Sequence, residues 1–563
     1  MIIPKRKRIE QSIVFLTLLV LGVTVAWSLR FIQDDAYISF RYVVNWLNGN
    51  GIVWNIGERV EGYSNFLWII LLLIPTALGF GIEETSIALG MLFYVGSLIV
   101  IYRLTFRLTN RGVALVTTLL LTTNITFAAY ATGGLETSLH TFICWLSLYF
   151  IFDSRVINPV YCTGISFLFA LSVLCRMDSV VFLLVPGMYM LTRIVFQDIS
   201  WGKRMVQLSA LILPVTVVVI IWTLFRWNYY GDLLPNTYYA KSQGITMDSL
   251  KLGIFFIWSF LKTYGLLPFL FAGVACVFYR DARMEKKIAV VFISTLLAWS
   301  VYLVKIGGGF MEFRFMVVVM PLIMIFVSVL ILELNNVFVR SGLVVGLILF
   351  SFGTQLSVKI GGWYTQQLND TGSFSVIPLR VLKAQTDPNR PLQLDAVGNY
   401  LNENFRNILV SVSPAGIMPF RAMDINFVDM FGLNDRWVPK NGAKKSDRRG
   451  HQKIATLSYL IDRGVNIVVE TPSYVPLGDE NEDVLKFEDL IAEFVLLNPE
   501  AVQMPGTASI LLLPFTDTEY LVVLYLSPHP SIDEFIKSRN IKQIFQTGVT
   551  SNINKLDNKI VSN

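Results

Sequence analysis

The sequence predicts a multi-span α-helical membrane protein that ends in a separate polar α/β domain. Of its 563 residues, 54% are hydrophobic and only 15% are charged, whereas a soluble protein carries about 25% charged residues. Long apolar stretches recur up to residue 357, and residues 358–563 have an ordinary charge density. We therefore expect a membrane domain over residues 1–357 and a second domain over residues 358–563.

Basic residues beside the apolar stretches predict the orientation of the chain. The Lys-Arg-Lys-Arg run at residues 5–8 precedes the first stretch, so the positive-inside rule places the N-terminus in the cytoplasm and residue 31 outside. About 11 stretches have the length and polarity of a span. They are residues 12–30, 86–106, 113–131, 136–152, 159–175, 179–196, 207–225, 253–279, 288–305, 315–334 and 341–357.

The apolar run at residues 66–80 is expected to lie in the outer interface and not to cross the membrane. It has about 15 residues and contains Pro75, whereas a span needs about 20 residues. Hydropathy favours crossing, but a crossing would place the cationic cluster from Arg103 to Arg111 outside. The interfacial reading predicts juxtamembrane helices beside the spans. It also places every motif-rich loop and the C-terminal domain on the extracytoplasmic face.

The polar residues 358–563 carry alternating strand and helix signals. Residues 408–412 and 465–469 are rich in β-branched residues and read as strands, and a helical pattern over residues 455–462 precedes the second one. Strands that alternate with helices are typical of α/β domains. We expect a small α/β domain.

The composition also narrows the possible chemistry. No two of the four cysteines have metal-ligand spacing, so neither a disulfide framework nor a zinc site is expected. With three histidines, a catalytic histidine cluster is not expected. The net charge of +6 is small and lies in loops at one membrane face, which indicates orientation and not nucleic-acid binding. No cofactor is expected, but Asp34 and Asp35 leave binding of a divalent cation open.

Two adjacent carboxylates, Asp34 and Asp35, directly follow the first apolar stretch. Unpaired burial there has a large desolvation cost, so they either form the polar edge of a loop or serve a function. Transfer of an activated sugar needs a carboxylate to take a proton, cations to hold a leaving phosphate, and aromatic residues to hold the sugar. Residues 31–65 offer the carboxylates, together with glycines, tyrosines and arginines.

These motifs closely resemble those of GT-C glycosyltransferases, the family that includes the mycobacterial terminal β-(1→2) arabinofuranosyltransferase of cell-wall arabinan. Similar proteins in Gram-negative bacteria are linked to lipopolysaccharide synthesis. The resemblance covers nearly all of residues 30–465. The segments that carry it are residues 34–42, 49–55, 57–65, 132–137, 230–241, 432–436 and 450–451.

The resemblance implies an inverting glycosyltransferase of the bacterial plasma (inner) membrane. Such enzymes move a sugar from a polyprenyl-phosphate donor to a cell-envelope glycan or lipid at the outer face; a pentose such as arabinofuranose is one option. It also implies that Asp34 is the general base, with Asp35 as the close alternative. Family members often have Gly-Gly-Asp where this chain has Gly307-Gly308-Gly309. That difference puts a supporting role of this loop, or the identity of the acceptor, in doubt.

Other polar residues of the outer face complete the candidate site. Cations that could hold the donor phosphate, or anchor at lipid headgroups, are Lys305, Arg314, Lys241 and Arg176. Candidates for substrate contacts are Arg41, Arg59, Glu61, Tyr63, Asn65, Glu136, Asp178, Asn236, Tyr238 and Tyr239. Helix-start acids, a local ion pair of Arg176 with Asp178, and an interfacial aromatic belt are the alternative roles for several of them. His140 is expected to be a core residue.

A lipid-linked sugar transporter or flippase is the main alternative. Transporters place ionisable residues near the midplane of the membrane and often contain inverted repeats. Here the carboxylates gather at one predicted face, and no convincing internal repeat is found. This one-sided distribution favours the enzyme over a transporter, and the intact Asp34-Asp35 pair favours it over an inactive relative.

Overall fold

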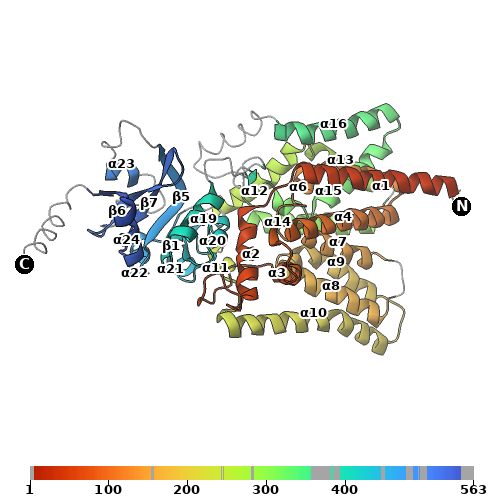
Figure 1. Ribbon diagram of the computed structural model, residues 1–563. Helices are drawn as coiled ribbons and strands as arrows, with labels where there is room; N and C mark the ends of the chain where they lie inside the picture. Colours follow the sequence, from red (N-terminus) through yellow and green to blue (C-terminus); the bar gives the residue numbers. More distant parts are fainter. Residues whose placement is uncertain are drawn as a thin grey trace, which may run out of the picture.

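The computed structural model describes residues 5–153, 157–241, 244, 246–279, 284–356, 379, 382–383, 393–445, 450–476, 486–491, 494 and 504–546. A large helical bundle makes up one end of the molecule, and a smaller domain built on a β-sheet makes up the other (Figure 1). The predicted domain boundary between residues 357 and 358 lies outside the described residues.

The bundle is built mainly from apolar helices. They are α1 (Lys5–Ser28), α3 (Phe66–Ala77), α4 (Ile82–Leu108), α5 (Arg111–Thr122), α6 (Ile125–Ala129), α7 (Thr137–Ile151), α8 (Pro159–Cys175), α9 (Ser179–Val195), α10 (Trp201–Tyr230), α12 (Met247–Thr263), α13 (Leu267–Tyr279), α14 (Lys286–Lys305), α15 (Met320–Glu333) and α16 (Val337–Leu356). Among the described residues, α4, α10 and α14 are long and apolar enough to cross a membrane, and α12 with α13 forms a fourth such unit if bent pairs are counted. Each predicted span overlaps a helix, but a count of about 11 spans is not confirmed.

The span predicted at residues 253–279 is not one continuous helix, because α12 and α13 meet at an angle of 87°. Gly265 lies between them with φ +61°, a left-handed conformation that ends a helix and that glycine adopts without strain. Pro268 follows in the first turn of α13, where its missing N–H costs no helical hydrogen bond.

Helix α2 (Asp34–Leu47) connects the two parts of the molecule. It lies across the end of the bundle, between the bundle and the sheet domain (Figure 1). Apolar side chains such as Tyr37 and Phe40 are buried on it, and both rings pack against Phe420 of the sheet domain. The short helix α11 (Asn236–Ala240) also lies at this junction.

The C-terminal sheet domain, described here from residue 393 to 546, is an α/β unit. Its six-stranded sheet has the order β2-β1-β5-β7-β6-β8. The strands are β1 (Leu409–Val412), β2 (Asn426–Asp429), β5 (Ile467–Pro476), β6 (Ser509–Pro514), β7 (Glu519–Tyr525) and β8 (Lys542–Phe545), with a separate pair β3 (Ala443–Lys444) and β4 (Lys453–Ile454). The helices are α19 (Leu394–Asn404), α20 (Ile417–Arg421), α21 (Val438–Asn441), α22 (Leu457–Asp462), α23 (Phe487–Ile491) and α24 (Pro530–Arg539). The predicted strands at 408–412 and 465–469 are confirmed as β1 and the start of β5.

The parallel part of this sheet is directed toward the bundle. Strand β1 pairs in parallel with β2 and β5, with Val410 opposite Phe427 and Ile467. The remaining neighbours in the sheet are antiparallel. Loops that follow the carboxyl ends of parallel strands commonly build binding sites. Here the loops after β1 and β2 contact α2 and the segment around α11.

Candidate functional site

Asp34 and Asp35 form the first turn of α2, directly after Gln33. Carboxylates are favourable at this position because the helix dipole places positive charge at the N-terminus. The Gln33 amide donates a hydrogen bond to the Gly133 carbonyl at 3.1 Å. The loop at residues 132–136, which belongs to one of the segments that carry the family resemblance, therefore fixes the start of the helix that carries both acids.

Close packing of glycine strengthens this attachment. Gly134 has φ +73°, and a Cβ on it would lie 2.8 Å from the Ala36 Cβ. Its carbonyl accepts a hydrogen bond from the Trp68 indole at 3.0 Å. Only glycine meets both the left-handed backbone and the tight contact.

The Asp34 carboxylate is held by the C-terminal sheet domain. Its Oδ1 accepts a hydrogen bond from the Ile417 amide at 2.9 Å. The pKa of Asp34 is raised to about 7. Burial is the main cause, the charges of Asp35 and Asp429 act in the same direction, and hydrogen bonds from the Ile417 and Gly416 amides oppose the rise. A carboxyl group with a pKa near neutrality is suited to general base catalysis.

A network of ion pairs centres on Glu136, a buried residue directly before α7. Its Oε1 accepts hydrogen bonds from Arg176 Nη1 at 2.7 Å and Arg314 Nη2 at 2.6 Å. Its Oε2 accepts one from the Asn65 amide at 3.0 Å. Asn65 also contacts the Ser39 hydroxyl on α2 at 3.1 Å. The network is thus connected to the helix that carries the two acids.

The two arginines of the network have further partners. Arg176 makes a two-point contact with Asp178, at 2.9 Å and 2.6 Å, as its alternative role predicted. Asp178 also accepts a hydrogen bond from the Tyr302 hydroxyl at 3.2 Å. Arg314 Nε donates to the Thr137 hydroxyl at 2.9 Å. Arg314 Nη1 also lies 3.5 Å from the Met311 sulfur. Each guanidinium has five N–H groups, and each uses three of them in the contacts described here.

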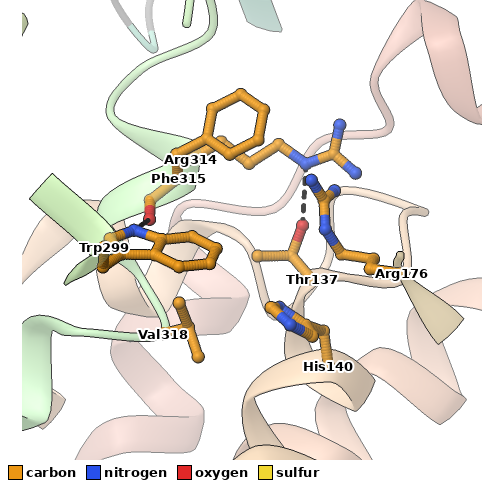
Figure 2. A pocket seen from close by; sticks show the side chains of 7 residues that line it. All are labelled: Thr137, His140, Arg176, Trp299, Arg314, Phe315 and Val318. Carbon is orange, nitrogen blue, oxygen red and sulfur yellow. Dashed lines mark hydrogen bonds between the residues drawn. The ribbon is translucent and has the colours of Figure 1, made fainter. Parts of the chain in front are cut away.

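Both guanidinium groups line a small cavity of about 10 Å³, which has room for about one water molecule. Figure 2 shows them side by side at the cavity, with Thr137 and His140 beneath them and Trp299 and Val318 opposite. Its lining residues are Thr137, His140, Arg176, Trp299, Arg314, Phe315 and Val318. His140 is 4% exposed, and its Nε2 has no hydrogen-bond partner among the described residues. Two cations and a polar nitrogen at one cavity can hold an anion.

Tyr130 is buried near both the acidic pair and Arg314. Asp35, Glu312 and Arg314 are all charged neighbours of its ring hydroxyl. The side chain is 1% exposed, and within the described part of the chain the hydroxyl has no hydrogen-bond partner. Tyr130 is thus a common neighbour of Asp35 in the acidic pair and of Arg314 at the cavity.

The loop after α14, which contains Gly307-Gly308-Gly309 and is called the glycine loop below, contributes a buried carboxylate that was not predicted from the sequence. A Cβ on Gly309 would lie 2.5 Å from Phe315 Cδ2, so this position has no room for an aspartate. Three residues later, Glu312 is 3% exposed and accepts a hydrogen bond from the Thr126 hydroxyl at 3.4 Å. Family members often have an acid where this chain has Gly309, and the loop instead brings the buried acid Glu312 close to Tyr130.

The four predicted phosphate ligands separate into two groups. Arg176 and Arg314 meet at the cavity, as described above. Lys305 is exposed at the end of α14. Lys241 lies beside Gly450 of the sheet domain, where a Cβ on the glycine would be 3.8 Å from the lysine Cε. The cavity therefore contains the two arginines but not the two lysines.

Arg41 occupies a position that favours a structural role. It is fully buried, and its guanidinium donates to the backbone carbonyls of Trp54 at 2.7 Å, Ala422 at 3.1 Å and Ile425 at 2.7 Å, and also to that of Pro419. Three of these carbonyls belong to the sheet domain. The side chain fastens α2 to that domain.

We expect Arg41→Ala to lower the free energy of unfolding by about 2–4 kcal/mol, because it leaves several buried carbonyls without a donor. Thermal unfolding in detergent, together with limited proteolysis between the two parts of the molecule, measures the effect. Arg406→Ala is the control, since Arg406 is exposed and pairs with Asp424 at the surface. Equal stability of the two variants would contradict a fastening role.

Asn236 also serves the junction between the bundle and the sheet domain. Its amide donates to the carbonyls of Gly432 at 2.8 Å, Leu433 at 3.0 Å and Asp435 at 2.8 Å. These residues belong to a segment that the sequence analysis singled out for its resemblance. The segments at residues 230–241 and 432–436 therefore form the two sides of one contact.

Glu61 and Tyr63 are buried in the same region. Glu61 forms a two-point ion pair with Arg226 of α10, at 2.5 Å and 3.2 Å. The Tyr63 and Tyr230 hydroxyls are 3.0 Å apart. Arg226 was not predicted as a site residue, because the sequence around a single arginine at the end of an apolar stretch does not indicate which residue it pairs with.

The remaining candidates lie at the periphery of the junction. Arg59 is exposed and stacks on Tyr229 at 4.7 Å. Tyr238 is exposed, and Tyr239 lies under the Lys440 ammonium at 5.5 Å. These three residues could contact a substrate only from the outer rim of the site.

Two residues of the segments that carry the family resemblance, Arg436 and His451, lie at this junction. Arg436 pairs with Asp232 at 2.7 Å. The His451 ring packs between Phe310 of the glycine loop and Phe431, with centroid distances of 5.1 Å and 4.4 Å. His451 therefore joins the sheet domain to the glycine loop.

Among the described residues, no group of three or more histidine, cysteine, aspartate or glutamate side chains could hold a metal ion. Binding of a divalent cation by the adjacent acids Asp34 and Asp35 stays the open alternative that the sequence raised.

The chain is similar in sequence to two known proteins. The chain is 25% identical over 375 residues to a terminal beta-(1->2)-arabinofuranosyltransferase of Corynebacterium glutamicum, covering 59% of this chain and 52% of that protein. It is 28% identical over 260 residues to the protein of the same name in Mycobacterium tuberculosis, covering 43% and 39%. The chain thus spans about half, or less, of the length of these relatives.

The structure resembles ArnT from Cupriavidus metallidurans bound to undecaprenyl phosphate. The TM-score is 0.53 at 12% identity, and the match covers 92% of this chain and 99% of ArnT. This likeness confirms a GT-C type of fold. Residues 383–524 match a family model described as a domain of unknown function (DUF8728).

Proposed function

We propose that this protein is a membrane glycosyltransferase that moves a sugar from a polyprenyl-phosphate donor to a glycan or lipid of the cell envelope. Two features carry the proposal. The carboxyl group of Asp34 has a pKa of about 7, and a cavity in the same protein is lined by the guanidinium groups of Arg176 and Arg314. A base and an anion site are the two elements that such a displacement requires. The curated relatives are arabinofuranosyltransferases, which makes arabinofuranose the first sugar to test.

In the proposed reaction, Asp34 takes the proton from an acceptor hydroxyl as its oxygen attacks the anomeric carbon of the donor. The bond from that carbon to the phosphate oxygen breaks, and polyprenyl phosphate leaves from the opposite side, so the anomeric configuration inverts. The N–H groups of Arg176 and Arg314 that remain available stabilise the leaving phosphate. Asp35 stays the alternative base.

The network explains how two arginines can lie side by side before a donor binds, because Glu136 and Asp178 balance the charges of the two guanidinium groups. An incoming phosphate adds negative charge to guanidinium groups that are already oriented. Such preorganisation removes the cost of turning the side chains during the reaction.

We further propose the topology that the basic loops predict. The N-terminus lies in the cytoplasm, and the candidate site and the C-terminal sheet domain lie outside the plasma membrane. The donor lipid then remains in the bilayer while its phosphate reaches the site at the outer interface. Reporter fusions after residues 31 and 82 should both report the outer side.

The function is tested by incubating the purified protein with a panel of polyprenyl-phosphate sugars and envelope extracts. We expect one donor to be consumed, with release of polyprenyl phosphate and a new glycosidic bond of inverted configuration by NMR. No transfer from any donor in the panel to any fraction would contradict the proposal.

We expect Arg314→Ala to lower kcat/KM for the donor by about 10²-fold, because it removes a donor group from the leaving phosphate. Arg314→Lys should recover part of the loss, since it keeps the charge but not the forked geometry. Arg406→Ala, at the exposed surface, is the control. Unchanged kcat/KM in Arg314→Ala would exclude Arg314 from phosphate binding.

A further inference from the structure

We infer that the turn formed by Ala415, Gly416 and Ile417 is part of the catalytic site and positions the Asp34 carboxylate through its backbone N–H groups. This inference rests on the proposed function for its catalytic meaning. It assigns a role to the matched domain of unknown function, because residues 383–524 include the turn.

A direct hydrogen bond joins the two parts of the molecule at this point. The Ile417 amide and Asp34 Oδ1 are 2.9 Å apart, although 383 residues separate them in the sequence. The bond crosses from the sheet domain to α2. A backbone amide has fewer degrees of freedom than a side chain, so it fixes the carboxylate more firmly.

The contact depends on glycine at residue 416. A Cβ there would lie 2.7 Å from Asp34 Cγ and still closer to the Asp34 carbonyl oxygen. Real Cβ atoms do not approach other atoms so closely. Any side chain at this position therefore forces the turn and the carboxylate apart.

The turn itself is held rigidly. It follows β1, which lies inside the sheet between β2 and β5. It leads into α20, where the Pro419 and Ala422 carbonyls accept hydrogen bonds from Arg41 of α2. At the end of α20, Arg421 pairs with Glu83 of α4 at 2.7 Å. The helix that carries Asp34 and the turn that holds it are thus fastened together at several points.

Two other charged groups face Asp34. Asp35 lies on the same helix and Asp429 at the end of β2, and both disfavour the ionised form of Asp34. The amides of the turn act in the opposite direction. Loss of the turn contact therefore raises the pKa of Asp34.

The test is Gly416→Ala in the full-length protein. We expect the acid limb of kcat/KM to move to higher pH by about one unit, with a loss of about tenfold at pH 6 that nearly disappears at pH 9. Labelling of Asp34 by a water-soluble carbodiimide, which reacts with the protonated carboxyl, should show the same shift by mass spectrometry. Gly442→Ala is the matched control. A Cβ there is also crowded, by the Val438 and Ile454 carbonyls, but it does not touch Asp34.

A folded Gly416→Ala protein with an unchanged labelling midpoint would overturn the inference. The labelling does not require sugar transfer, so it separates this result from a failure of the proposed function. If Gly416→Ala does not fold, hydrogen–deuterium exchange of the peptide containing Ile417 decides the question. Exchange should be faster in Asp34→Ala than in Asp34→Asn, whose amide oxygen still accepts the bond. Equal exchange in the two variants would also overturn the inference.

Discussion

Replacing Asp34 by asparagine should lower kcat for sugar transfer by about 10²–10⁴-fold, the usual contribution of a general base. Asparagine has the same shape and its Oδ1 can still accept the Ile417 amide, so the protein should fold and bind donor normally. In the unaltered protein, kcat/KM should fall as the pH drops below about 7, because the base must be ionised and its pKa is about 7. Transfer from the donor identified in the panel measures both effects.

Two variants control this experiment. Asp424→Asn changes an exposed acid that pairs with Arg406 at the surface, and the rate of transfer should not change. Asp35→Asn tests the adjacent acid. Because the charge of Asp35 raises the pKa of Asp34, this variant should also lower the pKa of Asp34. If Asp34→Asn transfers sugar at a near-normal rate while Asp35→Asn does not, the base is Asp35.

Replacing Glu136 by alanine should have the largest effect on stability. The side chain is buried, and its removal leaves Arg176 and Arg314 side by side without the carboxylate that bridges them. Breaking a buried ion pair by removing one partner costs about 3–5 kcal/mol, since an uncompensated charge remains in the interior. We expect a decrease of this size in the free energy of unfolding, measured by denaturation in detergent.

The control for this variant is Glu403→Ala, which removes an exposed carboxylate from α19. It should change the free energy of unfolding by no more than about 0.5 kcal/mol. A Glu136→Ala protein as stable as the control would show that the two guanidinium groups do not depend on Glu136. The bridging role of that residue would then have to be abandoned.

The sequence was informative where chemistry and local pattern coincide. The Asp34-Asp35 pair, the ion pair of Arg176 with Asp178, and the strands at 408–412 and 465–469 all follow from short-range signals. The meeting of Arg176 and Arg314 was only partly predictable, because each lies at a different helix end and nothing local connects them. Glu136 completes that connection.

Long-range contacts explain what the sequence did not predict. Arg41 and Asn236 were expected to bind substrate, because polar residues in motif-rich loops often do. In the structure their donors are used by carbonyls of the sheet domain, almost 200 residues or more away in the chain. Glu312 was not predicted, because the family's motif has its acid at the position of Gly309, where a Cβ would lie 2.5 Å from Phe315 Cδ2.

The most direct test of the central claim distinguishes chemistry from transport. The protein is reconstituted into liposomes with a polyprenyl-phosphate sugar and a soluble acceptor extract, and the lipids of both leaflets are analysed by mass spectrometry. We predict that free polyprenyl phosphate accumulates together with glycosylated acceptor, and that Asp34→Asn abolishes both. Movement of the intact lipid-linked sugar to the other leaflet, without release of polyprenyl phosphate, would contradict the glycosyltransferase and indicate a flippase.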